Sequence, residues 1–184
     1  MTTSHLSTRT ATAQDAQSLA RMAEETFRDA FAEQNTREDL DRYCADAFGE
    51  QQQLSEICDP ESITVLAERS NRLAGYAQIK TRSSIHCVAG DALAELSRFY
   101  LRKEHHGRGV ANVLMADVLA RAADAGARVL WLGVWEHNPR AIAFYRKCGF
   151  DAVGEKTFLI GSDLQRDLVL AVELEAPGTT RSNT

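Results

Sequence analysis

The fold is decided by residues 95–114, ELSRFYLRKEHHGRGVANVL. The segment 94–101 has the length of a strand, with aromatic residues and a partial alternation of polar and apolar side chains. A glycine loop, HHGRGVA, follows at 105–111. Beyond the loop, apolar residues recur at three- and four-residue spacing, which predicts an amphipathic helix that Gly126 can end. The order of strand, glycine loop and helix is typical of an anion site.

The loop has the properties that a phosphate requires. The first N–H groups of a helix lack partners within the helix, and the helix dipole adds partial positive charge at the same end. Gly107 and Gly109 have no Cβ, so the backbone can turn sharply and a phosphate can approach it. Arg108 adds a cation between them. We therefore expect a phosphate-bearing ligand at this loop.

Three simpler interpretations of the loop remain to be weighed. A nucleotide P-loop is excluded, because no Gly-Lys-Ser/Thr follows at the required spacing. The dinucleotide fingerprint is half met: Gly107 and Gly109 fit, but Asn112 occupies the place of the third glycine, with Glu136 available as the ribose-binding acid. A glycine turn that binds nothing is the third interpretation.

Two sequence motifs together favour a fourth interpretation of the loop. His106-Gly107-Arg108-Gly109-Val110-Ala111 resembles the pyrophosphate loop of the GCN5-related N-acetyltransferases (GNAT), Gln/Arg-x-x-Gly-x-Gly/Ala, with His106 in place of Gln or Arg. Downstream, residues 132–150, LGVWEHNPRAIAFYRKCGF, resemble the family's strand, Asn, helix, Tyr, Gly-Phe segment. The resemblance spans about residues 8–174, and within the family it is nearest to bacterial PaiA-type polyamine acetyltransferases.

The resemblance implies an α/β fold of three layers: a mixed, mostly antiparallel sheet with a central parallel pair of strands that splay apart, flanked by helices. It implies acetyl-CoA as cosubstrate and no metal. The pantetheine arm would pair with the freed backbone of Phe99, Tyr100 and Leu101, while Asn138 would hydrogen-bond the arm. The pyrophosphate would bind residues His106 to Ala111.

The implied reaction is transfer of the acetyl group to a primary amine by direct attack in a ternary complex. The resemblance assigns Tyr145 as the acid that protonates the leaving thiolate, and the N–H of Leu101 as oxyanion donor. An alkylamine has a pKa of about 10, so a base is needed at neutral pH. Glu95, in an otherwise uncharged strand segment, is the first candidate and Glu136 the second. A packing role for Tyr145, a capping role for Asn138 and an exposed position for Glu95 are the alternatives.

Charge indicates the kind of acceptor. The net charge is -5, yet residues 13–62 alone hold thirteen Asp or Glu against four Arg, a balance of -9. An acidic N-terminal third suits a small cationic amine such as a polyamine. Acetylation of protein N-termini or lysines, and a coenzyme-A sensor without catalysis, are the other functions considered.

Length and composition predict one domain over 1–176, which the resemblance implies is an N-acetyltransferase domain, and a disordered tail over 177–184. The N-terminus has no apolar leader region and no apolar run spans a membrane, so we expect a cytoplasmic protein without membrane or nucleic-acid partners. A homodimer is compatible with the resemblance. Cys44, Cys58, Cys87 and Cys148 have no metal-ligand spacing, and Cys148 is more readily explained by packing than as a nucleophile.

The remaining elements follow from periodicity and turn signals. We expect a strand over 6–12, a helix over 15–31 and a second helix from Thr36 to about Phe48. Asp59-Pro60 then breaks the chain. A hairpin follows over 63–80 around Ser70-Asn71-Arg72. Strands are expected at 128–135, 150–159 and 166–174, with a helix that starts at Asn138-Pro139 and stops at Gly149.

Overall fold

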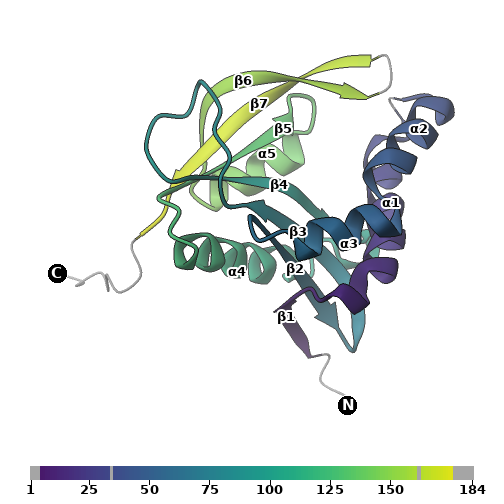
Figure 1. Cartoon of the computed structure of the whole chain (residues 1–184). Helices are drawn as coiled ribbons and strands as arrows, with labels where there is room; N and C mark the ends of the chain where they lie inside the picture. The colour runs from purple at the N-terminus through teal and green to yellow at the C-terminus, as the bar shows by residue number, and fades with distance from the viewer. Residues whose placement is uncertain (1–4, 34, 161–162, 176–184) are drawn as a thin grey trace.

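A computed structural model of the chain describes residues 5–33, 35–160 and 163–175. At its centre lies a seven-stranded sheet with the order β1-β2-β3-β4-β5-β7-β6 (Figure 1). The strands are β1 (Leu6–Thr10), β2 (Ser62–Arg69), β3 (Arg72–Lys80), β4 (Leu93–Leu101), β5 (Val129–Trp135), β6 (Asp151–Ile160) and β7 (Asp163–Glu173). Among the described strands, β4 and β5 are the only parallel neighbours, and the other five pairs are antiparallel.

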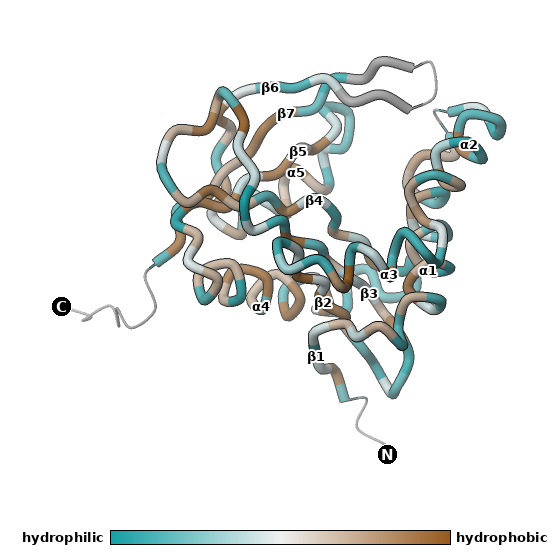
Figure 2. Tube along the Cα trace, viewed as in Figure 1, coloured by the Kyte–Doolittle hydropathy of each residue, from teal (hydrophilic) through white to brown (hydrophobic). Residues whose placement is uncertain are grey.

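Helices cover both faces of the sheet. On one face lie α1 (Ala16–Phe31), α2 (Arg37–Ala47) and α3 (Glu50–Cys58), and on the other lie α4 (Val110–Asp124) and α5 (Pro139–Lys147) (Figure 1). Each layer has its own apolar cluster, built around Phe27 and Tyr76 on the first face and around Leu114 and Leu130 on the second. In Figure 2 hydrophobic stretches run through the sheet and along α4, whereas α2 is largely hydrophilic. The predicted three-layer α/β fold is confirmed.

The parallel pair separates part of the way along its length. Glu95 lies opposite Trp131 in the last of three paired positions, although β4 stays paired with β3 as far as Leu101 and β5 stays paired with β7 as far as Trp135. A bulge causes the separation: Gln78 faces Arg98 and Ile79 faces Leu96, which leaves Ser97 as an extra residue in β4. The predicted splay therefore begins at a defined residue.

The local signals at element ends behave as expected. Asn138 caps α5, since its side-chain oxygen accepts from the N–H of Ala141 at 3.1 Å. Gly149 has a φ of 92° just after α5, and Gly126 has 88° after α4. In the β2–β3 turn, Ser70 and Asn71 have φ values of 52° and 59°, which match the right-handed twist of a tight hairpin.

Some boundaries differ from the prediction. Helix α3 was not predicted, because its sequence, EQQQLSEIC, has too few apolar residues to mark a face. The first strand ends at Thr10, since a 3₁₀ turn at Ala13–Asp15 leads into α1. The tail expected at 177–184 lies outside the described residues. Within the described ranges, no helix combines the length and the hydropathy that crossing a bilayer requires.

Candidate functional site

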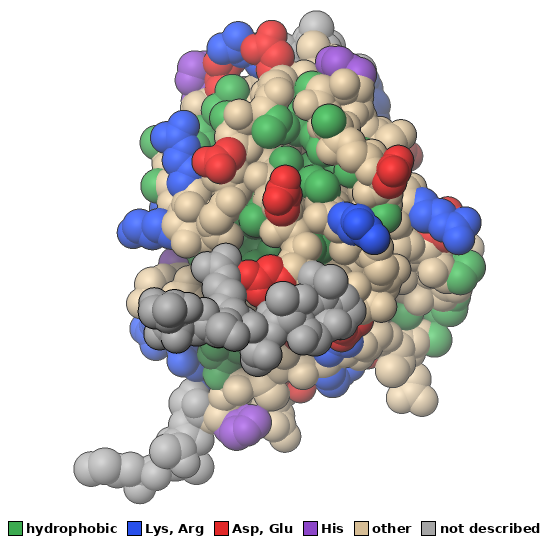
Figure 3. Space-filling view, turned by 90° about the vertical axis from the view of Figure 1, so that its left-hand side faces the viewer, with side chains coloured by type: hydrophobic (Ala, Val, Ile, Leu, Met, Phe, Trp, Pro, Cys, Tyr) green, Lys and Arg blue, Asp and Glu red, His purple; other side chains and the backbone are tan. Residues whose placement is uncertain are grey.

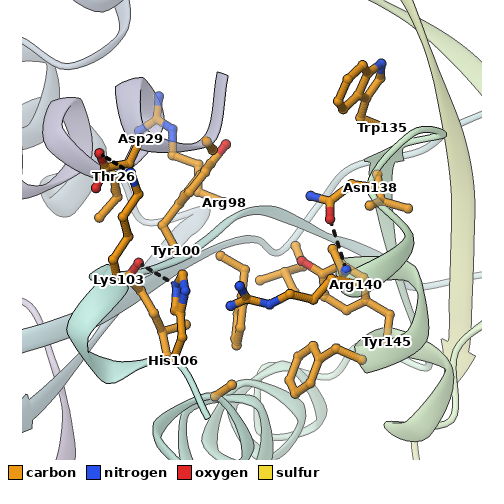
Figure 4. A pocket seen from close by; sticks show the side chains of 18 of the residues that line it. Thr26, Asp29, Arg98, Tyr100, Lys103, His106, Trp135, Asn138, Arg140 and Tyr145 are labelled. Carbon is orange, nitrogen blue, oxygen red and sulfur yellow. Dashed lines mark hydrogen bonds and ion pairs between the residues drawn. The ribbon is translucent and has the colours of Figure 1, made fainter. Parts of the chain in front are cut away.

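A cavity of about 750 Å³ occupies the gap between β4 and β5. Its floor is the stretch of β4 from Leu96 to Leu101, and Gly133, Val134 and Trp135 of β5 form the facing wall. The glycine loop and the first turn of α4 close one end, while α1 and α5 contribute the sides (Figure 4). The splay and the loop thus open into one space.

The glycine loop presents unobstructed backbone to this cavity. Gly107 and Gly109 have φ values of 71° and 80°, a region that favours glycine, and a Cβ built on either would meet no atom within 4 Å. The helix begins at Val110, and its first internal hydrogen bond is donated by Val113 to Gly109. The N–H groups of Val110, Ala111 and Asn112 precede that bond, so they are suited to hold an anion.

Two side chains of the loop, those of Val110 and Arg108, do not line the cavity. Val110 is fully buried in the core, so only its backbone can face a ligand. Arg108 is exposed and does not line the cavity, although its carbonyl accepts from Arg69 at 3.3 Å. Arg140, which sequence reasoning missed, does line the cavity and forms no ion pair among the described residues. On the cavity wall a cation is therefore offered by Arg140 rather than by Arg108.

His106 lies in the glycine loop, five residues beyond the end of β4, and contacts the carbonyl of Leu101 through Nε2 at 3.2 Å. A carbonyl can only accept, so Nε2 carries the proton. Burial lowers the pKa of His106, and nearby Arg140 lowers it further, which keeps the imidazole neutral at pH 7. The residue that departs from the family motif therefore ties the loop to the strand.

The backbone of β4 faces two ways. Arg102 donates its N–H to Ala74 of β3. Because successive amides of a strand point to opposite sides, the N–H of Leu101 points into the splay, and so does that of Phe99. Tyr100, by the same alternation, directs its backbone to β3. The predicted backbone contacts with the pantetheine arm thus fall on Phe99 and Leu101.

Tyr145 lies on the cavity wall contributed by α5. Its ring packs edge-on against Phe99 and Phe150, with centroid distances of 6.2 Å and 5.8 Å. Burial raises the pKa of Tyr145 above its ordinary value, so the phenol keeps its proton throughout the neutral range. The geometry permits both packing and proton donation. Asn138 and Trp135, at the start of α5 and the end of β5, complete this wall.

The two carboxylates selected from the sequence do not line the cavity. Glu95 accepts from Ser83 at 2.8 Å and lies 3.7 Å from the ammonium of Lys156, on the face covered by α1–α3. Glu136 is paired with Arg166, whose hydrogen bonds lower the pKa of Glu136 and make it a weaker proton acceptor. Neither is brought to the cavity wall by the fold.

The acidic helix α1 contributes one carboxylate to the cavity, Asp29. It forms an ion pair at 2.9 Å with Lys103, which also lines the space. Arg98 lies on the floor and is paired with Glu56 of α3. The cavity is therefore richer in cations than residues 13–62 suggested, because strand β4 brings basic side chains against the acidic helices.

Cys148 is half-buried against the core that α4 and α5 share, and burial raises the pKa of its thiol. This position agrees with packing. Among the described residues, no group of three or more His, Cys, Asp or Glu side chains is arranged to hold a metal ion.

The model of the acetyltransferase (GNAT) family matches residues 17–150. An uncharacterized N-acetyltransferase of Mycobacterium tuberculosis is 40% identical over 119 residues, which cover 64% of this chain and 71% of that protein. Another, from Lactobacillus delbrueckii subsp. lactis, is 31% identical over 149 residues, covering 81% and 86%.

Two solved structures share the fold. The PaiA N-acetyltransferase from Thermoplasma acidophilum, in complex with coenzyme A, superposes with a TM-score of 0.74 at 18% identity, covering 92% of this chain and 99% of that one. Mutant forms of the spermidine/spermine N-acetyltransferase SpeG from Vibrio cholerae give a TM-score of 0.63 at 21% identity, covering 92% and 95%.

Proposed function

The chain belongs to the GNAT family and is an acetyl-CoA-dependent N-acetyltransferase, and from this premise we propose that it acetylates the primary amine of a small cationic molecule, with a polyamine as the expected type. The observation that carries the proposal is the splay of β4 from β5 beside a glycine loop, both opening into one cavity. The gap between β4 and β5 suits the extended pantetheine arm of acetyl-CoA, and the glycine loop suits its phosphates.

The cavity fits acetyl-CoA by its own features. Gly107 and Gly109 leave the helix N-terminus open to the pyrophosphate, with Arg140 as the nearby cation. Phe99 and Leu101 offer backbone groups to the pantetheine arm. The oxygen of Asn138 caps α5, and its side-chain N–H₂ has no acceptor among the described residues. When bound, the cosubstrate supplies an acetyl group activated as a thioester.

The chain's own groups then serve the transfer. The N–H of Leu101 stabilises the oxyanion of the tetrahedral state, since it points into the splay. Tyr145 holds a proton at its phenol oxygen and donates it to the departing thiolate. A carboxylate must take the proton of the acceptor ammonium. The two candidates from the sequence, Glu95 and Glu136, do not line the cavity, and Glu136 is also held by Arg166.

Two findings support a cationic acceptor. The acidic helix α1 borders the cavity, with Asp29 on its wall. The two structural neighbours include an enzyme named for spermidine and spermine. Glu25 is paired with Arg102 and Asp29 with Lys103, which reduces the negative potential beside the cavity. A polyamine must therefore compete with those two cations.

The test is an acceptor panel with release of free thiol from acetyl-CoA as the readout. The panel contains polyamines, monoamines, amino acids, and peptides with a free N-terminus or lysine. We expect the highest kcat/KM with a polyamine at low salt. A higher kcat/KM for an amino acid would refute the cationic acceptor, and preference for the peptides would favour a protein acetyltransferase.

A further inference from the structure

A charged cluster outside the predicted site lies over Gly133, a residue of the cavity wall. A Cβ built on Gly133 would overlap the Cε of Lys156 and would lie 3.0 Å from its ammonium and 3.1 Å from Oδ2 of Asp167. The missing side chain at position 133 therefore creates the space that both groups fill. The two groups are within about 6 Å of each other.

Lys156 connects this place with Glu95. Its side chain starts on β6 and crosses the sheet over Gly133, ending 3.7 Å from the Glu95 carboxylate and 5.2 Å from the centre of the Trp131 ring. Ser83 donates to the other oxygen of Glu95 at 2.8 Å. The Lys156 ammonium is thus held by the Glu95 carboxylate and the Trp131 ring.

Asp167 is the member of the cluster without a hydrogen bond. The residue is only 7% exposed, and no donor to its carboxylate is found in the described part of the chain. It pairs in register with Trp135, so both side chains point to the same face of the sheet. Trp135 and Gly133 line the cavity. Asp167 itself does not line the cavity; it lies behind Gly133, with Oδ2 3.1 Å from the point where a Cβ at position 133 would stand, so it can act on the cavity across a water molecule.

The charges that face Asp167 come from two strands. They are Lys156 from β6 and, beyond it, Glu95 from β4, while β5 presents only uncharged residues. Arg166, its neighbour in sequence, points to the opposite face and pairs with Glu136 and Glu155. Burial raises the pKa of Asp167 and Lys156 opposes this, so the carboxylate is a better proton acceptor than an exposed one.

We propose that Asp167 accepts the proton of the acceptor ammonium, with Lys156 as its positioning residue and Glu95 as the anchor of Lys156. The inference rests on the proposed function. In the step, one N–H bond of the ammonium breaks and an O–H bond forms on Asp167, with the proton carried across one water molecule. The neutral amine keeps the electron pair for attack. The proton passes from Asp167 to solvent after transfer, which restores the carboxylate.

The test compares Asp167→Asn with the unchanged protein over pH 7 to 9. Without the carboxylate the reaction depends on amine that is already neutral, and this fraction rises about tenfold per pH unit below an amine pKa of about 10. We expect kcat/KM of Asp167→Asn to be about 10²-fold low at pH 7 and to recover as pH rises, while the unchanged protein varies little. Glu155→Gln, on the same hairpin but the opposite face, is the matched control and should keep the normal profile.

Two further variants separate the roles. Lys156→Met removes the cation that lowers the pKa of Asp167, so the acid limb of its kcat/KM profile should move to higher pH; this readout also serves if Asp167→Asn does not fold. Glu95→Gln should have a smaller effect than Asp167→Asn. A ratio of kcat/KM between the unchanged protein and Asp167→Asn that is constant with pH overturns the inference, as does pH-dependent loss in Glu95→Gln alone. If the unchanged protein acetylates no amine at any pH, the proposed function itself fails.

Discussion

Tyr145 illustrates how an aromatic residue on a helix can be both core and chemistry. Its ring is surrounded by Phe99, Phe144 and Phe150, which would explain a tyrosine or a phenylalanine equally well. A tyrosine differs from a phenylalanine at this position only by its hydroxyl. Tyr145 lies on the wall of the cavity, and its raised pKa means that the hydroxyl keeps its proton. The hydroxyl alone is therefore the group to test.

Tyr145→Phe should lower kcat by about 10²-fold while the affinity for acetyl-CoA stays close to normal, because only the proton donor is lost. Tyr76→Phe is the matched control. Tyr76 is fully buried on the other face, and its hydroxyl has no hydrogen-bond partner in the described residues. Steady-state kinetics with calorimetry of cofactor binding check both. Full turnover in Tyr145→Phe would leave this residue with a packing role only.

Gly109 and Gly126 allow a matched test of the loop. Both have a positive φ, 80° and 88°, and an added Cβ meets nothing within 4 Å at either. Alanine should cost each site about 1–2 kcal/mol of stability through backbone strain. Only Gly109→Ala should weaken acetyl-CoA binding, by about tenfold or more, since its Cβ obstructs the approach of a phosphate. Equal affinities in calorimetry would argue against a phosphate site at the loop.

At the residue scale, sequence motifs identify what the chain places close together. Gly107, Gly109, Asn138 and Tyr145 stand in two contiguous motifs, and all four line the cavity. The sequence did not predict a role for Asp167 or Lys156. They lie on strands whose pairing puts them beside Gly133 only after folding. No spacing in the sequence signals such a contact.

At the scale of elements, α3 braces the splayed strand. Glu56 of α3 forms a two-pronged ion pair with Arg98, one residue beyond the bulge, and the two side chains are 18% and 15% exposed. Gln78 of β3 also donates to Glu56, at 3.0 Å. The ion pair fixes β4 at the point where it leaves β5. The helix that sequence reasoning missed is thus part of the support of the site.

Glu56→Gln should destabilise the fold by about 3–5 kcal/mol at pH 7, because it leaves Arg98 buried without its counter-ion. Burial alone would raise the pKa of Glu56, but Arg98, Gln78 and Gln52 outweigh it, so the pKa lies below 4.5. The stabilisation is therefore complete above about pH 4.5 and is lost as pH falls through the lowered pKa.

Urea unfolding of Glu56→Gln across pH tests this. The difference from the unchanged protein should shrink below about pH 4.5. Glu38→Gln, which removes an exposed pair with Arg42, should cost no more than about 0.5 kcal/mol. A difference that does not change with pH would contradict the ion-pair explanation.

Local sequence signals were sufficient to predict most helices and strands. They were insufficient to predict where β4 separates from β5. Caps, turn residues and periodicity located the β2–β3 hairpin, α4 and α5. The splay depends on the bulge at Ser97, which has no glycine or proline to announce it and was expected only from the family resemblance. Helix α3 lacks an apolar stripe, because its contacts with β4 are made by a buried ion pair rather than by a hydrophobic face.

At the scale of the whole molecule, folding redistributes the charge that the sequence separates. Residues 13–62 carry a balance of -9, yet Glu25, Asp29 and Glu56 are paired with Arg102, Lys103 and Arg98 of the strand and loop that follow. On the face seen in Figure 3, acidic and basic side chains are interspersed among hydrophobic ones. The charge balance counted along the sequence therefore overstates the negative potential at the cavity.

Salt should still affect a polyamine acceptor. Raising the ionic strength to about 0.15 M shortens the screening length to about 8 Å, so KM for a polyamine should rise while kcat changes little. Asp29→Asn should raise the same KM, and Glu38→Gln, an exposed change on α2, should not. A KM that is independent of salt would show that charge does not select the acceptor.

The central claim is direct transfer of the acetyl group from acetyl-CoA to an amine within one ternary complex. A single-turnover experiment with enzyme in excess over acetyl-CoA carrying an isotopic label in the acetyl group, followed by mass spectrometry of protein and amine, tests it most directly. We predict that the label appears on spermidine in step with free thiol, that no acetyl-protein forms, and that little thiol is released without amine. Label on Cys148 or elsewhere on the protein before it reaches the amine, or loss of the label to acetate alone, would contradict the account.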